Sequence, residues 1–235
     1  MRGSQKNKNY KIKWTPNFAY AIGLITTDGN LSKDGRHLEF TSNDIQLVRT
    51  FKKCMSLIDV KIGTKTSGFT DKEYPRIQFS NVKLYKWLLE IGLMPNKSKT
   101  ISKLEIPNKY FFDFLRGCFD GDGTIYSFWD SRWHSSFMFY IAFSSASLNF
   151  LKWLQEKIKN LCRLNGSIGL AGNNTYLLRY AKEESIILFN KMFYTDNIPF
   201  LQRKCRKAQK IFQINTNHNK QSQLAEVEKL EDSHP

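Results

Sequence analysis

Two stretches of this chain, FAYAIGLITTDGN at residues 18–30 and FDFLRGCFDGDGT at residues 112–124, carry the same pattern. Each is an apolar segment with an internal glycine that ends in an Asp-Gly pair. A repeat of this kind is informative about architecture before any single motif is interpreted. The matched positions are Gly23 with Gly117, Asp28 with Asp122, and Gly29 with Gly123.

The similarity continues beyond these two stretches, because the segments that follow them also match in order. Each half reads helix, strand, strand, helix, strand, strand, helix, which predicts an α+β unit carried twice. Alternation of polar and apolar residues over 36–41 is typical of a half-buried antiparallel sheet, so one sheet face is left open. The predicted divisions are a basic N-terminal segment (1–13), a first half (14–98), a linker (99–110), a second half (111–212) and a polar C-terminal tail (213–235), expected as frayed helix or disorder.

The charge of the chain indicates which class of molecule it binds. It has 36 Lys and Arg against 21 Asp and Glu, a net charge of +15, and basic runs lie at 1–13 and 203–210. A large positive surplus favours a polyanion, with nucleic acid first. No apolar run is long enough to span a bilayer and no signal-peptide segment begins the sequence, so we expect an intracellular protein without a membrane partner. The four cysteines lack metal-ligand spacing and are expected to be reduced thiols.

The two motif segments are predicted to be helices that pack directly against each other. Small residues four positions apart let helix backbones approach closely, and each segment has such a pair on one face. That packing would bring Asp28 and Asp122 together about a pseudo-twofold axis. The small residues are Gly23 and Thr27 in the first segment, and Gly117 and Gly121 in the second.

The two aspartates are candidate metal ligands because of where they lie. Each ends a helix, just before a glycine suited to the left-handed C-cap conformation, where the helix dipole disfavours an anion. A hard divalent cation would resolve this repulsion, with Mg2+ the default, Mn2+ a substitute and Ca2+ expected to bind without supporting cleavage. The alternative is a simple helix-to-strand turn. The predicted metal contacts are Asp28, Asp122, Thr27 and Gly121; Asp120, which matches Thr26, is expected to serve in hydrogen bonding instead.

The segments AIGLITTDG (21–29) and LRGCFDGDG (115–123) resemble the two motif copies of monomeric LAGLIDADG homing endonucleases. The resemblance covers about residues 14–212, and the first copy departs from the motif at Thr26 and Thr27. It implies two pseudo-symmetric αββαββα halves whose antiparallel sheets form a saddle over double-stranded DNA. It also implies a monomer of the intron or intein homing type that makes a double-strand break with 3′ overhangs at a long asymmetric target.

Further site residues follow from the repeat and from the strand pattern. Lys97 and Lys204 occupy matching late positions and are assigned to phosphate or water-network stabilisation in catalysis, with ordinary surface lysines as the alternative. Polar residues on the strands are assigned to DNA, although a solvated strand face explains each one as well. They are Asn30, Ser32, Arg36, His37, Glu39, Thr41, Lys61, Lys65, Arg76 and Gln78 in the first half, and Ser127, Trp129, Arg132, His134, Tyr140, Ser144, Asn173 and Arg179 in the second.

The sequence predicts an Mg2+-dependent endodeoxyribonuclease and leaves two other functions open. One is an RNA maturase that assists splicing of its host intron, and the other is a DNA-binding protein that does not cleave. Both share the basic surface, whereas the intact pair Asp28 and Asp122 favours cleavage. The Asn-, Lys-, Ile- and Phe-rich composition suits an AT-rich genome, so we expect a mitochondrion, a chloroplast or the bacterial cytoplasm.

Overall fold

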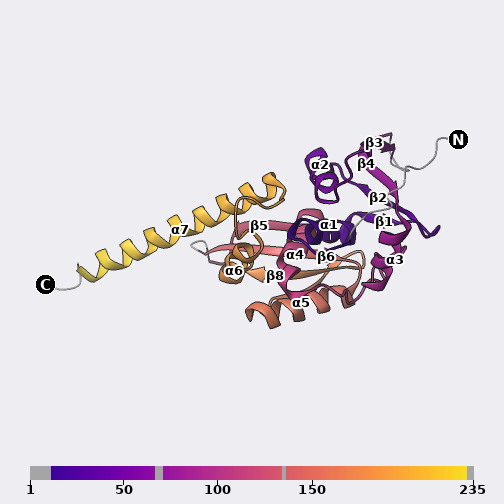
Figure 1. The fold of residues 1–235 in the computed structure, drawn as a ribbon. Helices are drawn as coiled ribbons and strands as arrows, with labels where there is room; N and C mark the ends of the chain where they lie inside the picture. The colour runs from indigo at the N-terminus through magenta and orange to yellow at the C-terminus, as the bar shows by residue number, and fades with distance from the viewer. Residues whose placement is uncertain (1–11, 67–70, 134–135, 232–235) are drawn as a thin grey trace.

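The computed structural model describes residues 12–66, 71–133 and 136–231. The two halves have the predicted order of elements, αββαββα, in an α+β fold (Figure 1). In the first half these are α1 (Pro16–Thr27), β1 (Gly29–Leu31), β2 (His37–Thr41), α2 (Ile45–Cys54), β3 (Gly63–Thr66), β4 (Glu73–Ser80) and α3 (Val82–Glu90). In the second they are α4 (Phe111–Gly121), β5 (Gly123–Trp129), β6 (Phe137–Ser145), α5 (Leu148–Cys162), β7 (Ser167–Gly172), β8 (Thr175–Ala181) and α6 (Lys182–Met192).

Side-chain caps define where several helices begin. Thr15 accepts a hydrogen bond from the Phe18 amide at the start of α1, with Pro16 in the first turn. Asp44 caps α2 and Ser147 caps α5 in the same way. Local sequence therefore determines where α1, α2 and α5 begin.

Each half contributes one four-stranded antiparallel sheet, with strand order β1-β2-β4-β3 in the first and β5-β6-β8-β7 in the second. In both sheets alternate residues point into the core, as Leu38 and Phe40 do from β2 and Ile77 and Phe79 do from β4. Helices α5 and α6 contact β6 and β8 on the core side. The opposite face of each sheet is left open, as the alternation predicted.

Helices α1 and α4 lie side by side at the centre of the molecule, between the two sheets (Figure 1). A Cβ atom at Gly23 would lie 2.1 Å from the Phe114 carbonyl oxygen, and one at Gly117 would lie 2.1 Å from the Tyr20 carbonyl oxygen. The two backbones therefore touch at these glycines. This confirms the close packing expected from the small-residue pattern.

A linker and a long helix complete the fold. Ile101, Leu104 and Ile106 of the linker are buried, so the two halves pack together instead of being tethered loosely. A 3-10 turn (Asn108–Tyr110) precedes α4.

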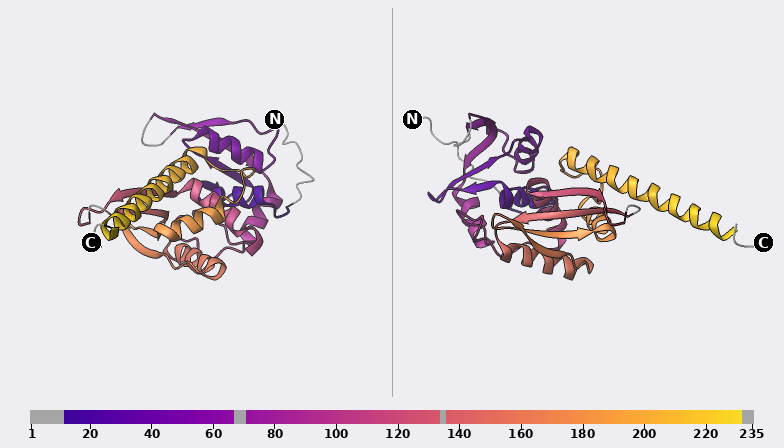
Figure 2. Two further views of the ribbon diagram at one scale, coloured as in Figure 1. Left: turned by 90° about the vertical axis from the view of Figure 1, so that its left-hand side faces the viewer. Right: turned by 180° about the vertical axis from the view of Figure 1, so that it is seen from behind.

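The last helix, α7 (Gln202–Glu231), packs through its first turns and then extends away from the body (Figures 1 and 2). Residues 213–231, expected to be a polar tail, continue this helix. None of the helices in the described ranges is both long enough and apolar enough to cross a membrane.

Candidate active site at the seam between the motif helices

Asp28 and Asp122 are the C-cap residues of α1 and α4, in equivalent conformations. Their φ and ψ angles are −93° and −5° for Asp28, and −92° and −3° for Asp122. Strands β1 and β5 begin directly after them, at Gly29 and Gly123. Each aspartate is thus placed by the helix end and the strand that follows it.

The expected left-handed conformation of Gly29 and Gly123 is wrong, because neither residue has a positive φ angle. Glycine is needed there for space. A Cβ atom at Gly29 would lie 2.6 Å from the Ile25 Cα, and one at Gly123 would lie 2.6 Å from the Phe119 Cα. The strand turns back tightly over the last helical turn, and any larger residue would push the aspartate out of position.

The two carboxylates lie close enough across the helix pair for the charge of Asp122 to affect the pKa of Asp28. A Cβ atom at Gly121 would lie 3.0 Å from the Asp28 Oδ2 and 2.0 Å from the Thr27 Oγ1, so Asp28 lies against the last turn of α4. Burial, followed by the negative charge of Asp122, raises the pKa of Asp28 to about 6. Burial also raises the pKa of Asp122, and the nearby Lys204 and Lys97 oppose this rise. Two desolvated carboxylates at close quarters disfavour their own ionisation unless a cation joins them.

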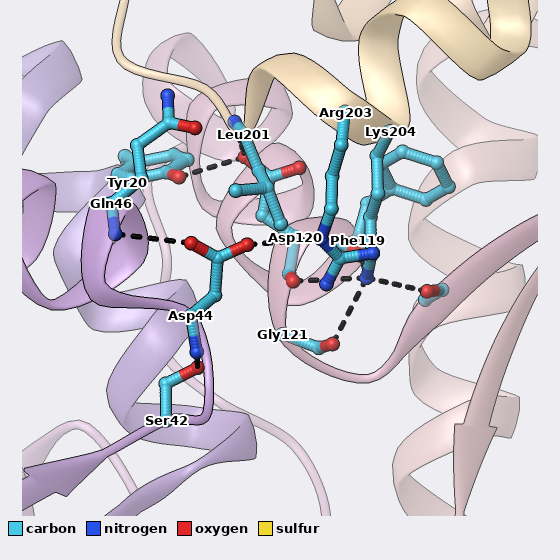
Figure 3. Close-up of polar contacts among 11 residues, drawn as sticks. Tyr20, Ser42, Asp44, Gln46, Phe119, Asp120, Gly121, Leu201, Arg203 and Lys204 are labelled. Atoms are coloured by element: carbon cyan, nitrogen blue, oxygen red, sulfur yellow. Dashed lines mark hydrogen bonds and ion pairs between the residues drawn. The ribbon is translucent and has the colours of Figure 1, made fainter. Parts of the chain in front are cut away.

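Lys97 and Lys204 hold the ends of the two motif helices. The Lys97 Nζ donates hydrogen bonds to the carbonyl oxygens of Thr27, at 3.4 Å, and Gly29. The Lys204 Nζ contacts four carbonyl oxygens of the equivalent turn, those of Phe119 at 2.6 Å, Asp120 at 2.9 Å, Gly121 at 3.0 Å and Gly123 at 2.6 Å (Figure 3).

Both lysine residues are buried, with 7% and 9% of their surface exposed, which excludes the alternative of ordinary surface lysines. Burial lowers the pKa of each to about 8. Their positive charges interact favourably with the negative ends of the helix dipoles and lie close to the aspartates.

Asp120 has a different task from Asp122. Its Oδ2 accepts hydrogen bonds from the Tyr20 hydroxyl and the Leu201 amide, both at 2.7 Å, and so ties α4 to α1 and to the start of α7 (Figure 3). This is the hydrogen-bonding role that the repeat argument predicted. Burial raises the pKa of Asp120 to about 6, while these hydrogen bonds oppose the rise.

A polar hollow of about 310 Å³ opens beside Asp28. Arg203 is at its edge, and its Nε donates to the Asp44 Oδ2 at 2.9 Å, which joins the start of α7 to the N-terminus of α2 in the other half (Figure 3). The sequence offered no signal for this pair, because its members are far apart in the chain. The hollow is lined by Asp28, Thr41, Ser42, Asn43, Leu47, Tyr74, Asp120, Gly121 and Arg203.

The donor set at the seam is compatible with a hard divalent cation. Asp28 and Asp122 supply carboxylate oxygens that burial has stripped of water, which raises both pKa values, and a bound cation would stabilise their ionised forms. The predicted contacts Thr27 and Gly121 lie at the same point, although their carbonyl oxygens already accept from Lys97 and Lys204. Within the described ranges, no three His, Cys, Asp or Glu side chains gather in a cluster that could hold a metal.

Most DNA-contact residues predicted in the first half share the open face of its sheet. The strand register pairs Asn30 with Glu39, Glu39 with Gln78, and Thr41 with Arg76. Glu39 lies at the centre of this face and forms ion pairs with Lys65, at 2.5 Å, and Arg76, at 3.3 Å. His37 lies on the same face. Ser32 and Arg36 lie in the β1–β2 turn, and Lys61 precedes β3, so these three are beside the face.

The predicted contacts in the second half divide differently. Tyr140, Ser144 and Arg179 lie on the open face, where the Ser144 Oγ donates to the Asp122 carbonyl at 2.9 Å. Ser127 and Trp129 follow the phase of the buried Ile125 and so lie on the other face of the sheet, where Trp129 packs against Phe137 and His218. Arg132 and Asn173 lie in turns, and His134 is outside the described residues.

The sequence reasoning missed Tyr126 and Phe128, which occupy the open face of β5 in place of Ser127 and Trp129. The signal was available, because the phase of the alternation could have been set from Ile125, the apolar residue nearest the motif.

No family model matches the chain, and no curated protein matches its sequence. Solved structures do match its fold. The homing endonuclease I-WcaI bound to its DNA recognition sequence has 17% identity over 86% of this chain and 94% of its own, with a TM-score of 0.56. I-DmoI in complex with DNA and Ca has 15% identity over 83% and 97%, with a TM-score of 0.54.

Full-length DUF199/WhiA from Thermatoga maritima also matches, with 16% identity over 94% of this chain and 70% of its own, and a TM-score of 0.55. These three matches show that the chain has the LAGLIDADG fold.

Proposed function

We propose that this protein is a site-specific double-strand DNA endonuclease that uses divalent metal at Asp28 and Asp122. The observation that carries the proposal is the placement of two equivalent carboxylates at the ends of two directly packed helices, between two open sheet faces. The net charge of +15 supplies attraction to a polyanion. Two solved structures with the same fold were determined with DNA, one of them also with Ca.

A bound divalent ion would lower the pKa of water and neutralise charge on the phosphate. The chain's own residues prepare the site for it. Asp28 and Asp122 present carboxylate oxygens from two equivalent helix ends, so each can serve one DNA strand. Lys97 and Lys204 hold the carbonyls of both turns and keep positive charge beside the carboxylates. Because one chain contains both halves, a monomer suffices, and unequal sheet faces favour an asymmetric target. We infer 3′ overhangs and a homing role from the motif resemblance.

The buried positions of Lys97 and Lys204 favour a positioning role for them over direct contact with phosphate. Each Nζ is already held by backbone carbonyl oxygens at the end of a motif helix. Their effect on the reaction would be exerted through the geometry and ionisation of Asp28 and Asp122.

The test is incubation of the full chain with a pooled duplex library in Mg2+, Ca2+ or EDTA, followed by sequencing of cut ends. We expect cleavage in Mg2+, sequence-selective binding without cleavage in Ca2+, and no cleavage in EDTA. Asp28→Asn and Asp122→Asn should each abolish double-strand cleavage while binding persists. Full cleavage by either variant would remove that residue from the active site.

A second candidate is a DNA-binding protein that does not cleave, because the positive net charge and the two sheet faces would serve binding with or without cleavage. In that case the wild type would bind selected duplexes in every metal condition and cut none of them. An RNA maturase would instead bind its host intron RNA and promote splicing, and the same protein preparation can be assayed for both.

A further inference from the structure

The open faces of the two sheets differ in chemistry. The first sheet presents charged and amide side chains, with Glu39 paired to Lys65 and Arg76. Within the described strands of the second sheet, Arg179 is the one charged side chain on the open face. The rest of that face is largely aromatic and apolar, and its principal members are Tyr126, Phe128, Met138, Tyr140 and Leu177.

The three aromatic rings on this face form one cluster, here called the aromatic cluster (Tyr126, Phe128 and Tyr140). Tyr126 is directly opposite Tyr140 in the strand register, and their ring centroids are 5.4 Å apart at an interplanar angle of 21°. Phe128 lies 6.2 Å from Tyr140 at 14°. The rings are therefore nearly parallel and turn their faces toward one another.

This geometry determines which kind of contact the face can make. Single-stranded nucleic acid is held by bases lying flat on open ring faces, and the ring faces inside the cluster are already taken. What remains is ring edges and the outer faces of Tyr126 and Phe128, with Met138 directly opposite Phe128. Such a surface suits small apolar groups. Phe128 is 45% exposed, so it is accessible to a ligand.

The position of the cluster points to duplex DNA as its occupant. Ser144, on the same open face, donates to the carbonyl of Asp122, so the face begins at the proposed active site and runs outward from it. The first sheet extends from Asp28 in the equivalent way. A duplex that reaches both aspartates would therefore pass along both faces. In its major groove, the one apolar group on the base edges is the 5-methyl of thymine.

We propose that the second half recognises its half-site through thymine methyl groups, whereas the first half recognises bases by hydrogen bonds and charge. The proposal rests on the proposed function, since it requires a DNA target. It predicts a target in which one half-site depends on thymine methyls at several positions and the other does not.

The experiment uses the full chain and a duplex selected from the library in Ca2+, which supports binding without cleavage. All thymines of one half-site are replaced by deoxyuridine, and then those of the other, which removes methyl groups and keeps every hydrogen bond. In one half-site only, we expect the Kd to rise about fourfold for each contacted methyl removed. The other half-site should show less than about a twofold change.

Phe128→Ala assigns the sensitive half-site to the aromatic cluster. This exposed position leaves the fold intact, and the variant should bind the thymine duplex more weakly while losing much of the response to deoxyuridine in that half-site. Ile58→Ala is the control, because it removes an 83% exposed apolar side chain that follows α2 in the other half. It should respond to deoxyuridine as the wild type does.

Four results would overturn the inference. If deoxyuridine raised the Kd equally in both half-sites, or in neither, the two halves would not differ in methyl recognition, although DNA binding would stand. A sensitive half-site whose response is unchanged in Phe128→Ala would move methyl recognition elsewhere. Stronger binding to single-stranded RNA than to any duplex, lost in Phe128→Ala, would make the face an RNA surface. Binding to no duplex at all would remove the proposed function and this inference together.

Discussion

Gly117→Ala is expected to force the two motif helices apart. The added Cβ would lie 2.1 Å from the Tyr20 carbonyl oxygen, whereas ordinary contact begins at 3.4 Å, so a separation of about 1 Å is needed. Overpacking of this kind typically costs about 1–3 kcal/mol, and the rigid backbone neighbour favours the upper end. The better helix propensity of alanine returns about 1 kcal/mol. We therefore expect the free energy of unfolding to fall by about 2 kcal/mol.

The assay is urea and thermal unfolding of Gly117→Ala beside Gly63→Ala. Gly63, the first residue of β3, has nothing within 4 Å of its added Cβ, so it reports a Gly-to-Ala exchange without a clash and without a gain in helix propensity. For a chain of this size the Tm should fall by about 4–8 °C in Gly117→Ala. Gly23→Ala should behave alike, and the double variant should lose less than the sum, because one separation of the helices accommodates both methyl groups.

The same separation should impair catalysis, because the helices carry Asp28 and Asp122. A misplacement of about 1 Å can cost about a hundredfold in rate. Cleavage should therefore fall much further than the folded fraction does. The reasoning is refuted if Gly117→Ala unfolds within about 0.5 kcal/mol of Gly63→Ala, or if the losses of Gly23→Ala and Gly117→Ala add fully.

Three further predictions concern charge. Because the pKa of Asp28 is raised from 3.8 to about 6, the folded state keeps its proton longer than the unfolded state, so the free energy of unfolding should fall as pH rises from about 4 to 6. At pH 8 the free energy of unfolding of Asp28→Asn should exceed that of the wild type by about 1–2 kcal/mol, and at pH 3 the two values should be equal. Ca2+ should stabilise only the wild type. A wild-type stability that rises from about pH 4 to 6 in urea titrations would contradict this. Lys204→Met should lower the free energy of unfolding by about 2–4 kcal/mol, because four carbonyl oxygens lose their cation. The control Arg203→Met, at the adjacent position, should lower it by less than about 1 kcal/mol, because the Arg203 ion pair is exposed. Equal urea midpoints for the two variants would show that Lys204 does not stabilise the end of α4. Glu39→Gln should release Lys65 and Arg76 from their ion pairs, so that they are available to DNA phosphates. In DNA-binding titrations the slope of log Kd against log salt concentration should steepen by about one unit. An unchanged slope would show that these cations do not reach phosphate.

Much of the fold and the centre of the site could be predicted because the information is local and is present twice. The order of elements follows from hydrophobic periodicity, and Gly23 with Gly117 indicated the direct helix contact. The duplication also distinguished Asp122 from Asp120, whose Oδ2 the structure places in hydrogen bonds to Tyr20 and Leu201. Spacing along one dimension is sufficient for conclusions of this kind.

The tertiary structure alone decided the contacts whose members lie far apart in the chain. Arg203 and Asp44, for example, form an ion pair that joins the start of α7 to the N-terminus of α2 in the other half. The repeat matched Lys204 with Lys97, but only the tertiary structure shows that the Lys204 Nζ contacts the carbonyl oxygens at the end of α4. The sequence by itself thus determined the duplicated fold and the aspartate pair, because these depend on local periodicity and on a repeat. Which charges and rings surround that pair depends on long-range packing, which no local pattern encodes.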